Sequence, residues 1–208
     1  MRRHRWLLPW LTALAGCMHL GVQSPQLREY RLDYAPPTIS GSPLPVALAV
    51  DYFSVAAVYD REAIVYRDDS YATGTYFDAG WSANPGNLLA DLLARDLAAS
   101  GLFRAVQRVP AMVPSDYHLG GEVQEIEERS TGSGCTAHLR VQLLLARSRA
   151  AANKSPVLLQ RAYAGEEPCP CNRPGRLVAA MSEALARMSA QLGRDVYDAI
   201  AADISRLP

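Results

Sequence analysis

The C-terminal end of the chain carries an apolar pattern that fits one long helix with a single buried face. Within Pro174–Ser205, apolar residues recur every three or four positions, at Leu177, Met181, Leu185, Met188, Leu192, Val196, Ile200 and Ile204. This spacing places them in one stripe along an α-helix. Gly193 inside the pattern indicates close packing or a bend. A helix with one apolar stripe has to cover another layer, which the preceding segments must supply.

The segments just before this helix alternate apolar and polar residues as strands do. Thr136–Ser148 has one apolar face, formed by Leu139, Val141, Leu143 and Leu145. Asp116–Glu128 lies before it across the loop Arg129–Gly134, so we expect these two strands to form the strongest β pair. Pro156–Tyr163 is predicted to be another strand.

The N-terminal half contains further strands and one helix. The predicted strands are Leu27–Tyr34, Val46–Phe53, Ile64–Tyr66, Thr75–Trp81 and Arg104–Val109. Pro85–Ala99 is predicted to be a helix, because Asn84 is a good N-cap and Ser100-Gly101 a typical end. We therefore expect an α+β fold, a two-layer sandwich in which two helices, the C-terminal one long, cover a largely antiparallel sheet.

The N-terminus has the three parts of a secretory signal. Three arginines within Met1–Arg5 precede the apolar run Trp6–Leu14, which is too short to span a bilayer. The run closes on Leu14-Ala15-Gly16-Cys17, which resembles the lipobox of bacterial lipoproteins. This resemblance implies that Cys17 becomes the first mature residue and carries a diacylglycerol and an N-acyl chain. The alternative is an ordinary secretory signal with an incidental cysteine. We expect no cofactor other than this covalent lipid.

The residue that follows Cys17 bears on the location of the protein. It is Met18 rather than aspartate, which, in the lipoproteins that this motif resembles, implies anchoring at the outer membrane, facing the periplasm. Residues 17–26 show no apolar period and are predicted to form a tether. The expected organisation is a signal peptide over residues 1–16, this tether, and a single domain over residues 27–208.

The charge balance of the mature chain excludes one class of partner. Removal of the signal lowers Lys+Arg from 21 to 18 against 21 Asp+Glu, so the mature net charge is about −3. Nucleic-acid binding would need a stripe of basic residues to contact phosphates, and the sequence has none.

Three cysteines remain beyond the anchor, and export places them in an oxidising compartment. We expect Cys135 to form a disulfide with Cys169 or Cys171, which leaves the third cysteine free or available for exchange. A Cys169–Cys171 bridge would be strained. A metal site that also uses His138 is an alternative, but the cysteine spacing does not fit zinc, so no metal is predicted. One residue between Cys169 and Cys171 also departs from a thioredoxin-like dithiol, which needs two.

No catalytic constellation is visible in the sequence. Ser133 lies in a Thr-Gly-Ser-Gly segment that lacks the first glycine of a nucleophile elbow. His118 and His138 fall in predicted strands, and the acidic segment Glu125–Glu128 fits a solvated strand edge. We therefore predict no catalytic residue and no enzyme activity.

Aromatic residues gather between Tyr52 and Trp81. Most are expected to pack in the core or across strands. Tyr59, Tyr66 and Tyr71 lie near predicted loops and are the candidates for a partner interface.

Several segments together resemble the ABC-type transport auxiliary lipoprotein family. They are Tyr30-Arg31-Leu32, the run from Asp60 to Arg67, Tyr76, Trp81, the helix start at Pro85 and Ser100-Gly101-Leu102-Phe103. The Cys-Pro-Cys segment is not expected of this family.

The resemblance implies a non-catalytic component of a lipid-transport system, which docks a periplasm-spanning assembly at the outer membrane. Its implied partners are an MCE-domain protein and an ABC transporter or integral inner-membrane component, and it can form a homo-oligomeric ring. A lipid-binding shuttle with its own hydrophobic cavity is one alternative. An envelope thiol-redox or metal protein that uses Cys135, Cys169 and Cys171 is another.

Overall fold

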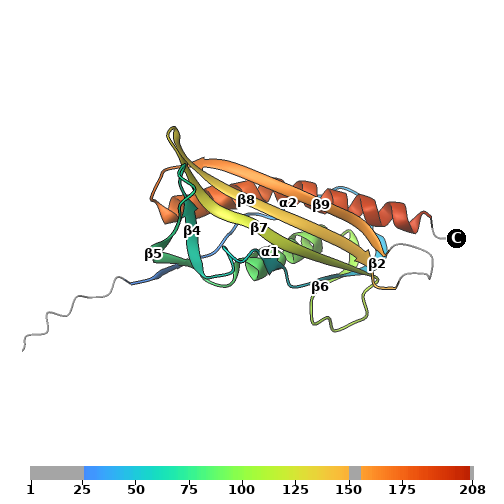
Figure 1. Cartoon of the computed structure of the whole chain (residues 1–208). Coiled ribbons are helices and arrows are strands. Elements are labelled where there is room, and N and C mark those ends of the chain that lie inside the picture. The colour runs from blue at the N-terminus through green and yellow to red at the C-terminus, as the bar shows by residue number, and fades with distance from the viewer. Residues whose placement is uncertain (1–25, 150–155, 207–208) are drawn as a thin grey trace, which may run out of the picture.

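The computed structural model describes residues 26–149 and 156–206, which form two layers, a nine-stranded sheet and a pair of helices (Figure 1). The strands are β1 (Arg28–Tyr30), β2 (Leu44–Val50), β3 (Ser54–Val55), β4 (Ala63–Arg67), β5 (Thr73–Trp81), β6 (Phe103–Arg108), β7 (Tyr117–Thr131), β8 (Gly134–Arg147) and β9 (Val157–Cys169). The helices are α1 (Pro85–Ala99) and α2 (Pro174–Ile204). The predicted α+β class is confirmed. The predicted signal peptide, most of the tether and Cys17 lie outside the described residues.

Strand β7 organises the sheet. On one side it pairs with β8, and β8 pairs with β9, both antiparallel. On the other side β2, β3 and β4 follow one another along β7, all parallel to it. Beyond them, β6 lies beside β2, β5 beside β4 and β1 beside β5. The long ladders are thus antiparallel as predicted, whereas the short N-terminal strands add parallel pairs.

Both helices lie on the same face of this sheet. Helix α2 packs on β8 and β9, and α1 packs beside α2 against β6 and β7. The stripe predicted for α2 is buried from Leu177 to Ile200, and it shares one continuous core with Trp81, Leu89 and Leu139. Because the apolar stripe of α2 faces this core, the helix lies against the sheet as a second layer.

The ends of α1 form as the sequence indicates. The Asn84 side chain accepts a hydrogen bond from the Gly86 amide at 2.9 Å, and Pro85 occupies the first turn. The helix closes at Ser100, followed by Gly101 with φ +66°, a conformation that favours glycine.

Several predicted strand limits differ from the structure, and three of these differences change how the chain packs. The segment Leu27–Tyr34 forms only the three residues of β1, because Leu32 turns into the core and the Tyr34 hydroxyl donates to Asp96 of α1 at 2.6 Å. The central strand ends at Val50 rather than Phe53. Strand β9 continues to Cys169, which pairs with Cys135 across the ladder instead of lying in a loop.

Candidate functional site

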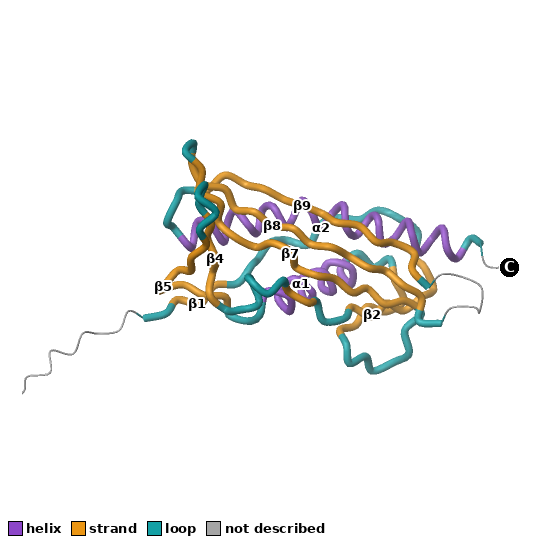
Figure 2. The backbone as a smooth tube through the Cα atoms, viewed as in Figure 1, coloured by secondary structure: helices purple, strands orange, loops and turns teal. Residues whose placement is uncertain are grey.

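The three tyrosines singled out from the sequence lie toward one end of the sheet, around the β4–β5 hairpin. Tyr66 is on β4, Tyr71 is in the turn of the hairpin, and Tyr59 is in the loop between β3 and β4. Strand β1 pairs with β5 at this end, through Tyr30 and Trp81, so the described chain starts beside the hairpin (Figure 2).

Tyr59 is buried and therefore cannot contribute to a surface. Its side chain is 8 % exposed, and its hydroxyl donates to Glu127 Oε2 at 2.7 Å. Burial, together with the Glu127 carboxylate, raises the pKa of Tyr59 well above its usual value. We remove Tyr59 from the candidate interface for this reason.

Glu127 belongs to a group of charged side chains on the face of the sheet opposite the helices. Leu139 pairs with Gly165, which lies against Ala184 of α2, so Leu139 faces α2 and its neighbour His138 points the other way. We call this group the outer-face cluster; its members are Glu125, Glu127, Arg129, His138 and Glu166.

The outer-face cluster is internally paired. The two ring nitrogens of His138 lie 2.6 Å from Glu125 and 2.8 Å from Glu166. Glu127, which is fully buried, accepts from Arg67 and from Arg129, each at 2.7 Å. No buried side-chain polar atom of the described residues lacks a hydrogen bond. Since every member is held by another, the cluster joins β7, β8 and β9, and Arg67 links it to β4, rather than presenting a reactive group.

Tyr66 and Tyr76 pack together on the opposite, helix-side face of the hairpin. Their rings meet edge to face with centroids 5.5 Å apart, and Tyr66 is 38 % exposed. The Tyr76 hydroxyl donates to the buried Glu128 at 2.9 Å. Burial and this carboxylate raise the pKa of Tyr76.

Two aromatic side chains of the hairpin project into solvent. Tyr71 is 87 % exposed and Phe77 is 80 % exposed, and neither has a ring contact among the described residues. We call Tyr71 and Phe77 together the hairpin surface, since Tyr66 faces the helix side. The sequence singled out Tyr71 but not Phe77. Strand alternation indicates that either Tyr76 or Phe77 faces outward, and only the fold decides which.

The cysteines lie where β8 and β9 approach the start of α2. Cys135 is disulfide-bonded to Cys171, which is one of the two pairings left open by the sequence. Cys169 is a free thiol, and its Cα partner across the ladder is Cys135. Burial and the nearby Glu128 charge raise the pKa of Cys169, so little of it is thiolate at neutral pH.

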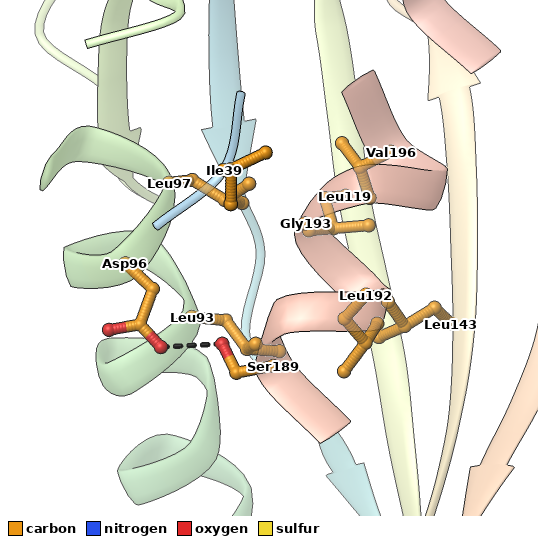
Figure 3. A pocket seen from close by; sticks show the side chains of 10 residues that line it. All are labelled: Ile39, Leu93, Asp96, Leu97, Leu119, Leu143, Ser189, Leu192, Gly193 and Val196. Atoms are coloured by element: carbon orange, nitrogen blue, oxygen red, sulfur yellow. Dashed lines mark hydrogen bonds between the residues drawn. The ribbon is translucent and has the colours of Figure 1, made fainter. Parts of the chain in front are cut away.

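The space between the helices and the sheet is filled by side chains (Figure 3). The residues around it are Ile39, Leu93, Asp96, Leu97, Leu119, Leu143, Ser189, Leu192, Gly193 and Val196, and the volume open to a water molecule is about 0 Å³. The one polar bridge there is from the Ser189 hydroxyl to Asp96 at 2.5 Å, within the set drawn. A lipid shuttle requires a hydrophobic cavity at this place, and the described layers enclose none.

Two open hollows, of about 450 and 460 Å³, share Arg147 and Asp203 near the end of α2. Arg147 donates to Asp203 through Nε at 2.6 Å, and the Tyr117 hydroxyl donates to the same carboxylate at 3.0 Å. Burial and Asp203 raise the pKa of Tyr117 to about 12. This ion pair ties β8 to α2, and its charges do not suit an acyl chain.

Within residues 26–149 and 156–206, no three His, Cys, Asp or Glu residues are grouped so as to hold a metal ion. Neither α1 nor α2 combines the length and apolar character that a membrane-spanning helix needs. The structure thus presents a closed α+β body, and the exposed aromatic side chains of its described residues are Tyr66, Tyr71 and Phe77 on the β4–β5 hairpin and Tyr52 after β2.

Comparison with known proteins assigns the family. The sequence model of the ABC-type transport auxiliary lipoprotein component matches residues 30–193, so the chain belongs to that family. The resemblance noted from the sequence is confirmed. The family is described as an auxiliary component of ABC-type transport and as a lipoprotein.

Solved structures share the fold. Protein XCC0632 from Xanthomonas campestris is 24 % identical, with a TM-score of 0.69, over 81 % of this chain and 97 % of that chain. An uncharacterised protein is 16 % identical, with a TM-score of 0.63, over 82 % and 99 %. The hypothetical protein CT253 from Chlamydia trachomatis is 11 % identical, with a TM-score of 0.50, over 76 % and 96 %. A search of curated proteins finds no match.

Proposed function

We propose that this protein is the outer-membrane docking component of an MCE-type lipid-transport system. In this proposal, acyl chains on Cys17 hold it in the outer membrane, and the domain faces the periplasm. Several acyl chains on one cysteine would make release from the membrane negligible, since one chain alone binds only reversibly. Its partners are an MCE-domain protein and, through it, an ABC transporter or integral inner-membrane component.

The observation that carries this proposal is the hairpin surface beside the start of the described chain. Phe77 is exposed two positions before Ala79, which pairs with Arg28 at the start of β1, and Tyr71 is exposed in the turn at the other end of the hairpin. Ten residues of tether extend at most about 33 Å, at about 3.3 Å per residue. Exposed aromatic side chains are enriched where proteins bind one another.

The closed core also supports docking over lipid carriage. A carrier must enclose at least one acyl chain, whereas the space between α1, α2 and the sheet has no room for a water molecule. The protein would then bind the end of the MCE-domain partner at the outer membrane, and that partner would provide the path for the lipid. The docking protein needs no catalytic group to do so.

Co-purification tests the proposal. The full-length lipoprotein, extracted from membranes in mild detergent, should recover an MCE-domain protein. The variant Cys17→Ala should lose outer-membrane fractionation but keep its fold. Native mass spectrometry of the same sample separates the alternative: bound phospholipid without an MCE-domain protein would favour the shuttle and contradict docking.

A further inference from the structure

Strand β5 leaves part of its outer edge without a neighbour. Its inner edge pairs with β4 at Thr73–Thr75 and again at Gly80, with a register shift between them, while β1 covers only Ala79–Trp81 on the outer side. Residues Thr73–Asp78 therefore have no strand beside them on that side within the described part of the chain. This open stretch of β5 includes Phe77 of the hairpin surface.

The hairpin turn shows which backbone groups point out. The Asp68 amide donates to the Ala72 carbonyl at 3.1 Å, and the Tyr71 amide donates to the Asp68 carbonyl at 3.3 Å. Ala72 thus directs its backbone toward β4. Because backbone direction alternates along a strand, Thr73 and Thr75 direct their N–H and C=O groups away from β4, toward the open edge.

This edge lacks the charged residues and proline that the β6 and β9 edges of the sheet have. Natural edge strands carry charges, proline or bulges, which prevent pairing with other chains; β5 has a register shift after Thr75, but its residues before that shift have none of the three. The open edge of β9 has Arg161, Glu166, Glu167 and Pro168, and that of β6 has Arg104 and Arg108. Ser70–Phe77 contains neither a charged residue nor a proline. An unprotected edge with exposed aromatic side chains is suited to accept a strand.

We propose that the Thr73–Phe77 edge binds an extended segment of a partner protein, which adds to the sheet as a strand beside β5. This inference rests on the proposed docking function and specifies its contact. Asp68 and Asp69 at the turn and Asp78 at the other end flank the edge, so the segment should carry Lys or Arg at its ends. Phe77 would pack on the apolar side chains of the segment.

Two other occupants fit less well. A second copy paired through this same edge would bring the same three carboxylates toward one another, and like charges oppose such pairing. A lipid surface would bury the outward N–H and C=O groups of Thr73 and Thr75 without hydrogen-bond partners. A partner strand satisfies those groups and complements the charge.

One substitution pair isolates the edge. Thr75→Pro removes the outward N–H, which no strand of the described sheet uses, and proline is tolerated on an edge. Thr75→Val keeps that N–H and the branched shape, so it is the matched control. The probe is a synthetic peptide of alternating threonine and valine with a lysine at each end. Its binding to the full-length lipoprotein in detergent micelles is measured by fluorescence anisotropy.

We expect wild type and Thr75→Val to bind the peptide alike and Thr75→Pro to bind at least tenfold more weakly. A peptide with glutamate at both ends should also bind more weakly. No binding by wild type, or equal binding by Thr75→Pro, overturns the inference. The inference is also overturned if Thr75→Pro changes only dimer formation, or only binding to phospholipid vesicles. The peptide assay needs no MCE-domain protein, so its failure is distinct from failure of the docking function.

Discussion

Ile39 lies against Gly193 so closely that a Cβ atom on residue 193 would be 2.1 Å from the Ile39 Cδ1 atom. The glycine noted in the long helix thus marks close packing, and it explains how the segment before β2 enters between the helices. Ile39 is 6 % exposed. This contact closes the space that a lipid carrier would need to keep open.

Gly193→Ala should therefore destabilise the protein, by about 1–3 kcal/mol, because overpacking outweighs the helix preference of alanine. Urea denaturation measures the free energy of unfolding. The double variant Gly193→Ala with Ile39→Ala should lose less free energy of unfolding than the two single variants lose in sum, because removal of the Ile39 side chain relieves the overpacking. Gly175→Ala, where a Cβ meets Tyr30 only at 3.5 Å, is the matched control and should not destabilise. Equal effects at both glycines would contradict the packing account.

The Cys135–Cys171 disulfide closes a loop with a sequence separation of 36 residues. Replacing both cysteines by serine should lower stability by roughly 3–4 kcal/mol in the chain-entropy model. Cys169→Ser should change stability much less. Peptide mapping under non-reducing conditions checks the pairing directly. A Cys135–Cys169 link as the major species would contradict the structure.

The Cys169 thiol should react slowly with alkylating reagents at neutral pH, because burial and the Glu128 charge raise its pKa. Glu128→Gln removes that charge, lowers the pKa and should speed iodoacetamide labelling several-fold at pH 8. Glu122→Gln on the same strand is the control. Unchanged labelling in Glu128→Gln would show that its charge does not act on Cys169.

The outer-face cluster should make stability depend on pH through Glu125. Burial alone would raise the pKa of Glu125, but the hydrogen bond from His138 and the Arg129 charge lower it below the usual 4.5. A lowered folded-state pKa contributes stability that is present above 4.5 and is lost as pH falls through the folded value. The stability difference between wild type and Glu125→Gln should thus shrink below pH 4.5. A constant difference down to pH 3 would contradict this coupling.

The parts of the fold that depend on local pattern could be predicted from the sequence. The cap at Asn84 and the end at Gly101 predict helix α1, and alternation around a polar loop predicts the β7–β8 pair. The parts that depend on distant partners could not. The parallel pairing of β2, β3 and β4 with β7, and the turn of Leu32 into the core, are settled by contacts far apart in the chain.

The same distinction applies to the site. Tyr59 lies near a predicted loop, but in the structure it is buried and donates a hydrogen bond to Glu127, 68 positions away. Phe77 and Tyr76 are adjacent in one strand, and only Glu128 on β7 determines that Tyr76 turns inward. The sequence shows where the aromatic residues gather, whereas which of them are exposed depends on the tertiary structure.

The central claim, docking through the hairpin surface, is tested most directly by the amount of MCE-domain protein recovered with the full-length lipoprotein. The double variant Tyr71→Ser with Phe77→Ser should recover at least tenfold less than wild type. Met112→Ser is the control, since Met112 is 96 % exposed on the loop between β6 and β7. It should recover the wild-type amount. Equal recovery by all three proteins, or no MCE-domain protein with wild type, would contradict the account.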